Sequence, residues 1–488
     1  SSPCYYYPLK SNMKTNKFDI IVIGAGSAGL SVGLAMNKLG FQVLMIARSE
    51  KEVGGECLNT GCIPSKALIH VAKIVHHARS AAEFGWDGKG VTDWCKVLDY
   101  VKNAQDIIRT HENAETLRQA GITVALGHAQ FVDKRSVQVN GKIFVGKKIV
   151  IATGSRPQPL NVPGIELVSC FDNETIFGMD KLPETLLVAG GGPVGVEIAQ
   201  AMSRLGSRVT LVHNGPMILE HDDPALSGIL FHRLEAEGIT ILLNCQLDSF
   251  TSAHEARVRM KDGASRYVSF ESVFIATGRV LNIEGLELPN ARIQVREDRI
   301  GSNDYLQTSN KHVFLCGDVA GRLKFSHVAE YHARILINNF FSPIKKKHRV
   351  DNLSWVTFTD PELATFGLSE AQLRQRGIPY ERLEQDFVGD DRAAADDYRY
   401  GKLIVLIKKG RVPGRRRILG GSMIAPNAGE LIQELLLLQI SRSSLNPLFD
   451  KIYPYPVAAR INQQLAIRLR ERQITSVTKA LLRWAFHL

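Results

Sequence analysis

The sequence predicts an α/β fold with two Rossmann-like units and a C-terminal α+β domain. Two apolar strands each lead through a glycine-rich turn into a helix, and two later strands both end in Ala-Thr-Gly. After about residue 350 the pattern changes to alternating strand-like segments. The length of 488 residues agrees with three domains, since a domain holds roughly 150 residues.

The first unit begins at residue 18. Residues 18–23, Phe-Asp-Ile-Ile-Val-Ile, form an apolar run that is typical of a buried parallel strand. A glycine-rich turn follows at 24–29, and the small and apolar residues 28–39 predict a helix. Gly40 ends that helix and 41–46 predict the next strand, which completes a βαβ unit.

The same order returns further along the chain. Residues 185–189 predict a strand, 190–195 form a second glycine-rich turn, 194–205 predict a helix, and 208–212 predict the strand after it. The chain therefore contains two such units.

Two strands that end alike mark where the chain crosses between the units. Residues 149–154 and 273–278 are both apolar and both end in Ala-Thr-Gly, so we expect each to close one unit. From residue 351, strand-like segments such as 402–407 precede a strongly apolar helix at 430–440, which predicts the third domain.

Both glycine-rich turns have the spacing Gly-x-Gly-x-x-Gly between a strand and a helix. In this context the glycines let the backbone approach a pyrophosphate, whose charge the helix N-terminus stabilises. The sequence therefore predicts two dinucleotide sites. Their glycines are Gly24, Gly26 and Gly29 in one site, and Gly190, Gly192 and Gly195 in the other.

The residue that usually holds the adenosine ribose is not acidic in either unit. An acidic side chain normally ends the second strand, but Ala47 and His213 take these positions, with Glu50 a candidate substitute in the first unit. In the second unit the missing carboxylate removes repulsion of a 2′-phosphate, which His213 and Arg208 would attract. This charge pattern favours NADPH over NADH.

The segment 54–66 carries the clearest chemical motif. It places Cys57 and Cys62 five residues apart, and Pro64 suits the first turn of a helix. Two cysteines at this spacing can close a small disulfide ring, and a helix N-terminus favours the thiolate. A zinc site is the other interpretation, but no second pair with ligand spacing accompanies the cysteines. We predict a redox-active pair and no metal site.

Composition limits the partners and the location. The formal net charge is +11, yet the basic runs at 345–349 and 415–417 are typical of solvated surfaces, and no nucleic-acid-binding motif is present. The 7 cysteines do not form the framework of a secreted protein, and no apolar run is long enough to predict a transmembrane helix. We expect a cytoplasmic protein that does not bind nucleic acid.

These motifs together resemble those of the pyridine nucleotide-disulfide oxidoreductases, the family of glutathione reductase, dihydrolipoamide dehydrogenase and mercuric reductase. The resemblance extends over roughly residues 18–465. Besides the turns and the cysteine segment, it includes Gly317-Asp318 within 313–320, which matches a second flavin-binding motif. It also includes 326–330, and 358–362 at the start of a dimerisation domain.

The resemblance implies a domain division, FAD as cofactor with NADPH or NADH, and a homodimer. The division is an N-terminal extension at 1–17, an FAD-binding domain at 18–155 and 279–350, an NAD(P)-binding domain at 156–278, a dimerisation domain at 351–470 and a tail at 471–488.

The resemblance also implies roles for single residues. Electrons pass from the nicotinamide through the flavin to the cysteine pair, with Cys62 next to the flavin and Cys57 exchanging with substrate. Lys66 and Glu197 form an ion pair beside both rings. The flavin site comprises Gly24, Gly26, Gly29, Lys66, Thr153, Gly154, Asp318 and Ala329, and the NAD(P) site comprises Gly190, Gly192, Gly195, Glu197, His213 and Gly278.

The chain departs from the family at its acid–base residues. Tyr455 takes the position of the histidine that the partner subunit supplies, and Arg460 takes that of the glutamate that orients it. A tyrosine with a pKa near 10 is a poor base at pH 7, so we expect slow turnover of lipoamide or glutathione. Mercuric reductases resemble this chain in having the tyrosine, but 461–488 lacks their C-terminal cysteine pair.

Three functions follow as alternatives. The first is a flavin-dependent reductase acting on sulfur groups, similar to dihydrolipoamide dehydrogenase, with a disulfide as acceptor. The second is a reductase of metal ions, similar to mercuric reductase, or of quinones. The third is a redox sensor or scaffold that has lost turnover. The apolar tail at 474–488 leaves two interpretations open, an amphipathic helix on a membrane surface or a helix packed on the dimer.

Overall fold

The computed structural model describes residues 16–88, 90–321, 323–410, 416–472 and 474–487. The predicted extension at 1–17 lies outside the described residues except for its last two, as does Arg415 of the basic run at 415–417. The chain forms two compact units. The first comprises the described residues of 16–65, 98–158 and 278–348, and the second comprises those of 66–97, 159–277 and 349–487.

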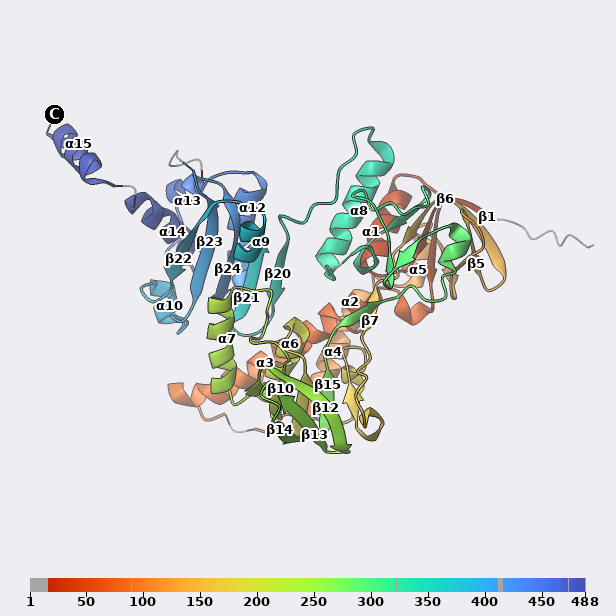
Figure 1. Ribbon diagram of the computed structural model, residues 1–488, viewed down its shortest axis with the longest axis horizontal. Helices are drawn as coiled ribbons and strands as arrows, with labels where there is room; N and C mark the ends of the chain where they lie inside the picture. The colour runs from red at the N-terminus through yellow and green to blue at the C-terminus, as the bar shows by residue number, and fades with distance from the viewer. Residues whose placement is uncertain (1–15, 89, 322, 411–415, 473, 488) are drawn as a thin grey trace, which may run out of the picture. The chain divides into compact units, whose positions relative to one another are not determined.

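A seven-stranded sheet forms the centre of the first unit (Figure 1). Its strands, in spatial order, are β3 (Thr123–Leu126), β2 (Val43–Ala47), β1 (Asn16–Ile23), β6 (Lys142–Ile151), β5 (Ser136–Val139) and β4 (Gln130–Phe131), with β19 (Val313–Leu315) also paired to β6. Strands β3, β2, β1, β6 and β19 are parallel, and β5 and β4 form an antiparallel edge.

The side chains of β1 alternate between two apolar cores. Ile20 and Val22 pack with α1 (Ser27–Lys38) and α8 (Ser326–Phe341), whereas Ile21 and Ile23 pack with β4, β5 and the segment after β16 (Arg279–Leu281). Because both faces are covered, residues 20–23 of the strand are all apolar. The other elements here are α2 (Gly55–Asn59), most of α4 (Trp94–Arg109), α5 (Ala114–Gln119), β7 (Ser155–Pro157), which pairs with β16, and β17 (Val295–Arg296), which pairs with β18 (Arg299–Ile300).

The second unit contains a parallel sheet that repeats the βαβ pattern. Its strand order is β11 (Thr240–Leu242), β10 (Arg208–Val212), β9 (Thr185–Ala189), β15 (Ser272–Ile275) and β8 (Cys170–Phe171). An antiparallel sheet of β12 (Cys245–Ser252), β13 (Glu255–Met260) and β14 (Ser265–Ser269) shares an apolar core with β9. The helices of this part are α3 (Cys62–Ser80) from Lys66 onward, α6 (Pro193–Leu205) and α7 (Pro224–Ala236).

The rest of the second unit is an α+β arrangement. Its antiparallel sheet has the order β20 (Ser354–Thr357), β21 (Glu362–Gly367), β24 (Ile418–Ala425), β23 (Lys402–Lys408) and β22 (Tyr380–Asp386). Its helices are α9 (Glu370–Gln375), α10 (Asp391–Ala395), α11 (Ala428–Leu431), α12 (Gln433–Ile440), α13 (Asn446–Asp450), α14 (Arg460–Glu471) and α15 (Ser476–Phe486). The helix predicted at 430–440 is thus divided between α11 and α12.

Two Rossmann-like sheets followed by an α+β part confirm the predicted fold class. In the described part of the chain, none of the helices combines the length and apolar character needed to cross a bilayer.

Candidate active site

The two glycine-rich turns are built alike. Gly24 has a φ of +111°, and a Cβ on it would lie 2.2 Å from the carbonyl oxygen of Ala152. Gly190 has a φ of +117°, and its Cβ would lie 2.3 Å from the carbonyl oxygen of Ala276. Each turn therefore packs against the Ala-Thr-Gly end of a neighbouring strand, with no room for a side chain.

Both helices that follow these turns begin without a side-chain cap. Their N-caps are Gly26 for α1 and Gly192 for α6. Gly29 and Gly195 let each helix pack onto its turn, because a Cβ would lie 1.9 Å and 2.0 Å, respectively, from a backbone oxygen. The N–H groups of each first turn are thus not capped by a side chain, as a pyrophosphate site requires.

The predicted flavin residues of the first unit include one unsatisfied polar group. Thr153 Oγ1 is buried and has no hydrogen-bond partner among the described residues. Gly154, with a φ of +71°, has open space where a Cβ would stand. Asp318 accepts a hydrogen bond of 2.5 Å from Ser155 Oγ. Ala329 is buried in α8 and leaves room for the turn that carries Asp318. These residues fit a bound flavin nucleotide, which would supply partners for the hydroxyl.

Sequence reasoning missed Ser155, Arg279 and Glu56. The Arg279 guanidinium donates to Ser155 Oγ at 2.8 Å and to the Ser155 carbonyl oxygen at 2.9 Å, and it forms an ion pair with Glu56. Glu56 precedes Cys57, so Arg279 connects the strand pair β7–β16 to the cysteine segment. Their positions in the sequence could have indicated Ser155 and Arg279, since each directly follows an Ala-Thr-Gly.

Two glycines set the backbone before the cysteines. Gly54 and Gly55 have φ values of +92° and +65°, which side chains disfavour. A Cβ on Gly55 would lie 2.4 Å from the Cα of Gly26, so α2 starts against the first glycine-rich turn. This contact places Cys57, in α2, beside the dinucleotide turn of its own unit.

Cys57 and Cys62 are free thiols whose side chains are hydrogen-bonded to each other. That hydrogen bond and, secondly, burial raise the pKa of Cys57, while Ser326 and Ser27 act in the opposite direction. Cys62 Sγ also lies 3.5 Å from Ser326 Oγ, at the start of α8. Cys57 therefore holds its proton in the dithiol. Ser326 lies in the segment 326–330 that carries part of the family resemblance, but no sequence pattern indicates its contact with Cys62.

Lys66 and Glu197 form the predicted ion pair within the second unit. Lys66 Nζ lies 2.8 Å from Glu197 Oε2, and the other carboxylate oxygen accepts the Phe358 backbone N–H at 2.8 Å. The ammonium group also lies 4.6 Å from the centroid of the Phe358 ring. Every oxygen of this buried carboxylate is thus occupied, which offsets the cost of removing its charge from water.

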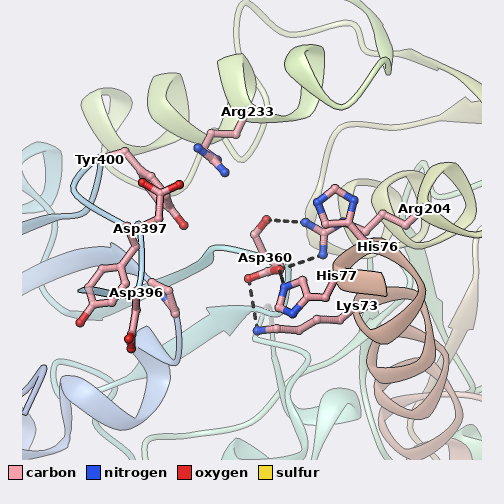
Figure 2. Close-up of a pocket in the computed structure, with 11 residues that line it drawn as sticks. Lys73, His76, His77, Arg204, Arg233, Asp360, Asp396, Asp397 and Tyr400 are labelled. Atoms are coloured by element: carbon pink, nitrogen blue, oxygen red, sulfur yellow. Dashed lines mark hydrogen bonds and ion pairs between the residues drawn. The ribbon is translucent and has the colours of Figure 1, made fainter. Parts of the chain in front are cut away.

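A second group of charged residues, two helical turns further along α3 and α6, binds the segment that contains Phe358. Arg204, seven residues after Glu197, lies 2.9 Å from Asp360, and Lys73, seven residues after Lys66, lies 3.2 Å from it. Figure 2 shows Asp360 between these cations and His77, at the wall of a cavity of about 320 Å³. Burial favours the protonated acid, but the Arg204 and Lys73 charges hold the pKa of Asp360 below its ordinary value. Segment 358–360 is therefore fixed to α3 and α6.

The remaining predicted residues differ in their surroundings. His213 Nδ1 accepts the Gly191 N–H at 3.2 Å, beside the second glycine-rich turn. Gly278 belongs to the first unit, whereas the other predicted NAD(P) residues belong to the second. Ala47 is buried, and its carbonyl oxygen accepts the Gly127 N–H. Glu50 is exposed, 3.8 Å from Arg118.

Tyr455 is an exposed side chain near the C-terminal end of the second unit. Its hydroxyl donates to Asp391 Oδ2 at 3.0 Å, and the Arg460 guanidinium lies 5.1 Å from its ring centroid. The hydrogen bond to the Asp391 carboxylate raises the pKa of Tyr455. At neutral pH, even less of this tyrosine is therefore ionised and able to accept a proton than of an ordinary one.

The comparisons with known proteins agree with this geometry. Residues 18–333 match the pyridine nucleotide-disulphide oxidoreductase family, and 353–465 match its dimerisation domain, which supports the predicted homodimer. The chain is 32% identical over 470 residues to a dihydrolipoyl dehydrogenase of Thermus scotoductus, covering 95% of this chain and 99% of the relative. It is 27% identical over 444 residues to a mercuric reductase of Staphylococcus aureus, covering 90% and 80%.

Among solved structures, the HOCl-induced flavoprotein disulfide reductase RclA from Escherichia coli superposes with a TM-score of 0.81 at 25% identity, covering 92% of this chain and 99% of that one. The chain therefore belongs to the pyridine nucleotide-disulphide oxidoreductases, enzymes that use FAD and a pyridine nucleotide, as the sequence predicted.

Proposed function

We propose that this protein reduces a disulfide with electrons from NADH or NADPH, through FAD and the Cys57–Cys62 pair. The observation that carries the proposal is the dithiol itself, with Cys57 and Cys62 hydrogen-bonded to each other beside the dinucleotide turn. When bound, FAD would accept two electrons from the nicotinamide and deliver them to this pair. The glycines of the two turns, Thr153 and Asp318 are the groups of this chain that would hold the nucleotides.

The dithiol can complete the reaction with its own atoms. Cys57, once deprotonated, attacks one sulfur of a substrate RS–SR′, so that a Cys57–SR bond forms and R′S⁻ leaves. Cys62 then attacks the Cys57 sulfur, closing the internal disulfide and releasing RS⁻. The two thiol protons end on the two products, and the pair has given up two electrons. Because the pKa of Cys57 is raised, its deprotonation limits this exchange unless a base assists.

A metal ion is the second candidate acceptor. Tyr455 is hydrogen-bonded to Asp391 and is no base, and reduction of a metal ion needs less acid–base assistance than thiol exchange. Two proteins similar to this chain support that class. One is named mercuric reductase, and RclA has been solved as a Cu(II) complex at 25% identity. Quinones belong to the same alternative, since they can accept electrons without the cysteines.

The test is thiol labelling after reduction under argon. Alkylation and peptide mass spectrometry should find Cys57 and Cys62 protected in the oxidised enzyme and labelled after one equivalent of NADH or NADPH. Exposed Cys95 should be labelled in both states and buried Cys316 in neither. A protein that binds no FAD, or that leaves the pair unlabelled, would refute the proposal and favour a sensor or scaffold.

A Cys57→Ser variant separates the acceptors. Reduction of a disulfide acceptor should stop, because no thiolate attacks the substrate sulfur. Reduction of a quinone at the flavin should continue at about the wild-type rate. If disulfide reduction persists in this variant, the exchange scheme above is wrong.

We also infer that α15 contacts an anionic membrane surface. Val477, Leu481 and Trp484 recur at helical spacing and are 66%, 60% and 66% exposed. Lys479 and Arg483 lie on another face of the helix, and 474–487 contains no acidic residue. An apolar face beside a basic one is the pattern of interfacial helices, and it complements a negatively charged lipid surface.

Vesicle sedimentation tests this contact. The full chain should sediment with phosphatidylserine-containing vesicles and not with pure phosphatidylcholine, and a Leu481→Ser, Trp484→Ser variant should remain in solution. Val91→Ser, which changes a side chain that is 98% exposed elsewhere, serves as the control. A wild-type chain that does not sediment would overturn this inference, and a tail variant that dissociates the dimer would show that α15 packs on protein.

A further inference from the structure

The cavity beside Asp360 lies wholly within the second unit. Among the described residues, its lining comes from α3, α6, α7 and the C-terminal part of this unit, and includes neither the cysteines nor a glycine-rich turn. Its volume of about 320 Å³ is within the range of small-molecule sites, roughly 300–1,000 Å³. Most such sites are lined by apolar side chains. Here every lining residue except Pro426 has a polar side chain, which suits a charged ligand.

Side chains of opposite charge line the two sides of this cavity (Figure 2). The helix α3 contributes Lys73 and His76 to one side, and the segment after α10 contributes Asp396 and Asp397 to the other. Arg233 reaches from α7 towards the acidic side. A ligand in this cavity would therefore meet both positive and negative groups.

Most of the charged lining residues already have partners in the protein. Asp360 lies 2.9 Å from Arg204 and 3.2 Å from Lys73. Asp396 lies 2.5 Å from Arg392, one turn earlier in the chain. Because each of these charges faces an opposite one, they add little net charge for a ligand to bind.

Two charged lining residues differ from these. Within the described part of the chain, Arg233 and Asp397 have neither an ion pair nor a side-chain hydrogen bond. The guanidinium carbon of Arg233 lies over the Tyr400 ring, 4.1 Å from its centroid, which orients the guanidinium and leaves its N–H groups able to donate. Such a planar group binds a carboxylate through two parallel hydrogen bonds.

The cavity also offers neutral polar groups. Burial and, secondly, the Arg204 charge lower the pKa of His76, so its imidazole is neutral at pH 7 and provides one donor and one acceptor. Burial raises the pKa of Tyr400 to about 12, so its hydroxyl keeps its proton. These two side chains are complementary to a part of the ligand that is polar but uncharged.

We propose that this cavity binds a small zwitterion, an α-amino acid with an uncharged polar side chain, whose carboxylate pairs with Arg233 and whose ammonium group pairs with Asp397. The proposal does not depend on the proposed function, since the cavity contains none of the residues assigned to the nucleotides or to the cysteine pair. Inorganic phosphate fits less well, because Asp397 repels it. A metal ion fits less well too, since the described residues contain no group of three or more side chains able to hold one.

The test is calorimetry on the FAD-loaded dimer with L-glutamine as the probe. Glutamine should bind saturably, at one site per subunit. N-acetyl-L-glutamine lacks the ammonium group and L-glutamine α-amide lacks the carboxylate, so each should bind at least about tenfold more weakly. Inorganic phosphate should show no saturable binding.

Two variants assign each charge to its partner. Arg233→Gln and Asp397→Asn should each weaken glutamine binding at least about tenfold. Arg233→Gln should not weaken the α-amide further, and Asp397→Asn should not weaken the N-acetyl compound further, because each lost pair is already absent. Both side chains are exposed, and asparagine tolerates the φ of +55° at position 397, so we expect both variants to fold.

Arg399→Gln is the matched control. Arg399 is an exposed arginine two residues after Asp397, but it does not line the cavity, so its replacement should leave the affinity unchanged. Three results would overturn the proposal: no saturable binding of glutamine, saturable binding of phosphate instead, or an equal loss of affinity in Arg399→Gln and Arg233→Gln.

Discussion

Lys66 Nζ lies 2.8 Å from Glu197 Oε2, and the glutamate side chain is only 6% exposed. The two residues lie on different helices, α3 and α6, and both contact Phe358 in the segment before β21. The same two helices hold Asp360 through Lys73 and Arg204. Each helix therefore contributes two charged residues seven positions apart, and the two resulting groups of ion pairs both hold the segment 358–360. Only the first group includes residues that the family resemblance assigns to electron transfer.

Lys66→Met should impair both stability and chemistry. It leaves the Glu197 carboxylate buried without its cation, which we expect to cost about 2 kcal/mol, because Lys66 is about one-third exposed and its charge is partly screened. The rate of flavin reduction by nucleotide should fall at least about tenfold. Denaturant unfolding and anaerobic stopped-flow absorbance measure the two effects.

Lys73→Met is the control for that variant. Lys73 is 36% exposed and pairs with Asp360, so its loss should destabilise the chain by a similar amount. Its effect on flavin reduction should be less than about twofold, since it lies two turns further along α3. Equal loss of rate in the two variants would mean that Lys66 acts through stability alone.

Thr153→Val should weaken FAD binding but should not lower the stability of the protein without FAD. The hydroxyl is buried and has no hydrogen-bond partner in the described part of the chain, so valine removes a desolvated group at little cost in shape. With FAD bound, the loss of one hydrogen bond should raise the dissociation constant about fivefold. Flavin fluorescence titration measures the affinity. Thr357→Val, whose hydroxyl is also buried and lacks a partner among the residues that the structure describes, should leave the affinity unchanged. An unchanged affinity of the Thr153→Val variant would place the flavin elsewhere.

Tyr455→Phe should change disulfide turnover by less than about twofold, because the tyrosine hydroxyl is not a base near pH 7. Tyr455→His should accelerate turnover of a disulfide such as oxidised lipoamide and introduce a pH dependence near pH 6.5, the ordinary pKa of histidine. Steady-state rates between pH 5.5 and 8.5 measure both. Abolished turnover in Tyr455→Phe would instead make the hydroxyl essential.

Asp222 makes the stability of the second unit depend on pH. Burial raises its pKa to about 6, although Thr365 and Trp355 donate hydrogen bonds to it at 2.6 Å and 2.8 Å. A raised pKa means that the folded state binds the proton more tightly than the unfolded state. The stabilisation is therefore complete below the ordinary pKa of 3.8 and is lost as the pH rises through 6.

Between pH 5 and pH 7, the wild type should lose about 1 kcal/mol more stability than Asp222→Asn, which does not titrate. Urea unfolding at both pH values measures the difference, because other titrating groups contribute equally to the two proteins. A difference of the opposite sign would show that the carboxylate is ionised and stabilising at neutral pH.

The sequence by itself determined the repeated units and the cysteine segment. The strand at 18–23, the glycine-rich turns and the helices after them arise from local pattern, since burial on both faces and close approach of the backbone dictate residue types over a few positions. The same holds for Cys57 and Cys62, which lie within one short helical segment. The roles assigned to single site residues stay predictions.

Tertiary structure decided which side chains meet. Ser326 beside Cys62, Arg279 beside Ser155 and Phe358 beside Lys66 are pairs far apart in the chain, and no local pattern encodes their contact. The second nucleotide unit shows the physical reason most directly. By sequence, His213 ended a strand without a carboxylate, and Arg208 was close by in number. Folding places Arg208 a strand length away and brings Glu220 Oε1 to 3.7 Å from His213 Nε2, because a strand separates its ends while a loop brings its ends together.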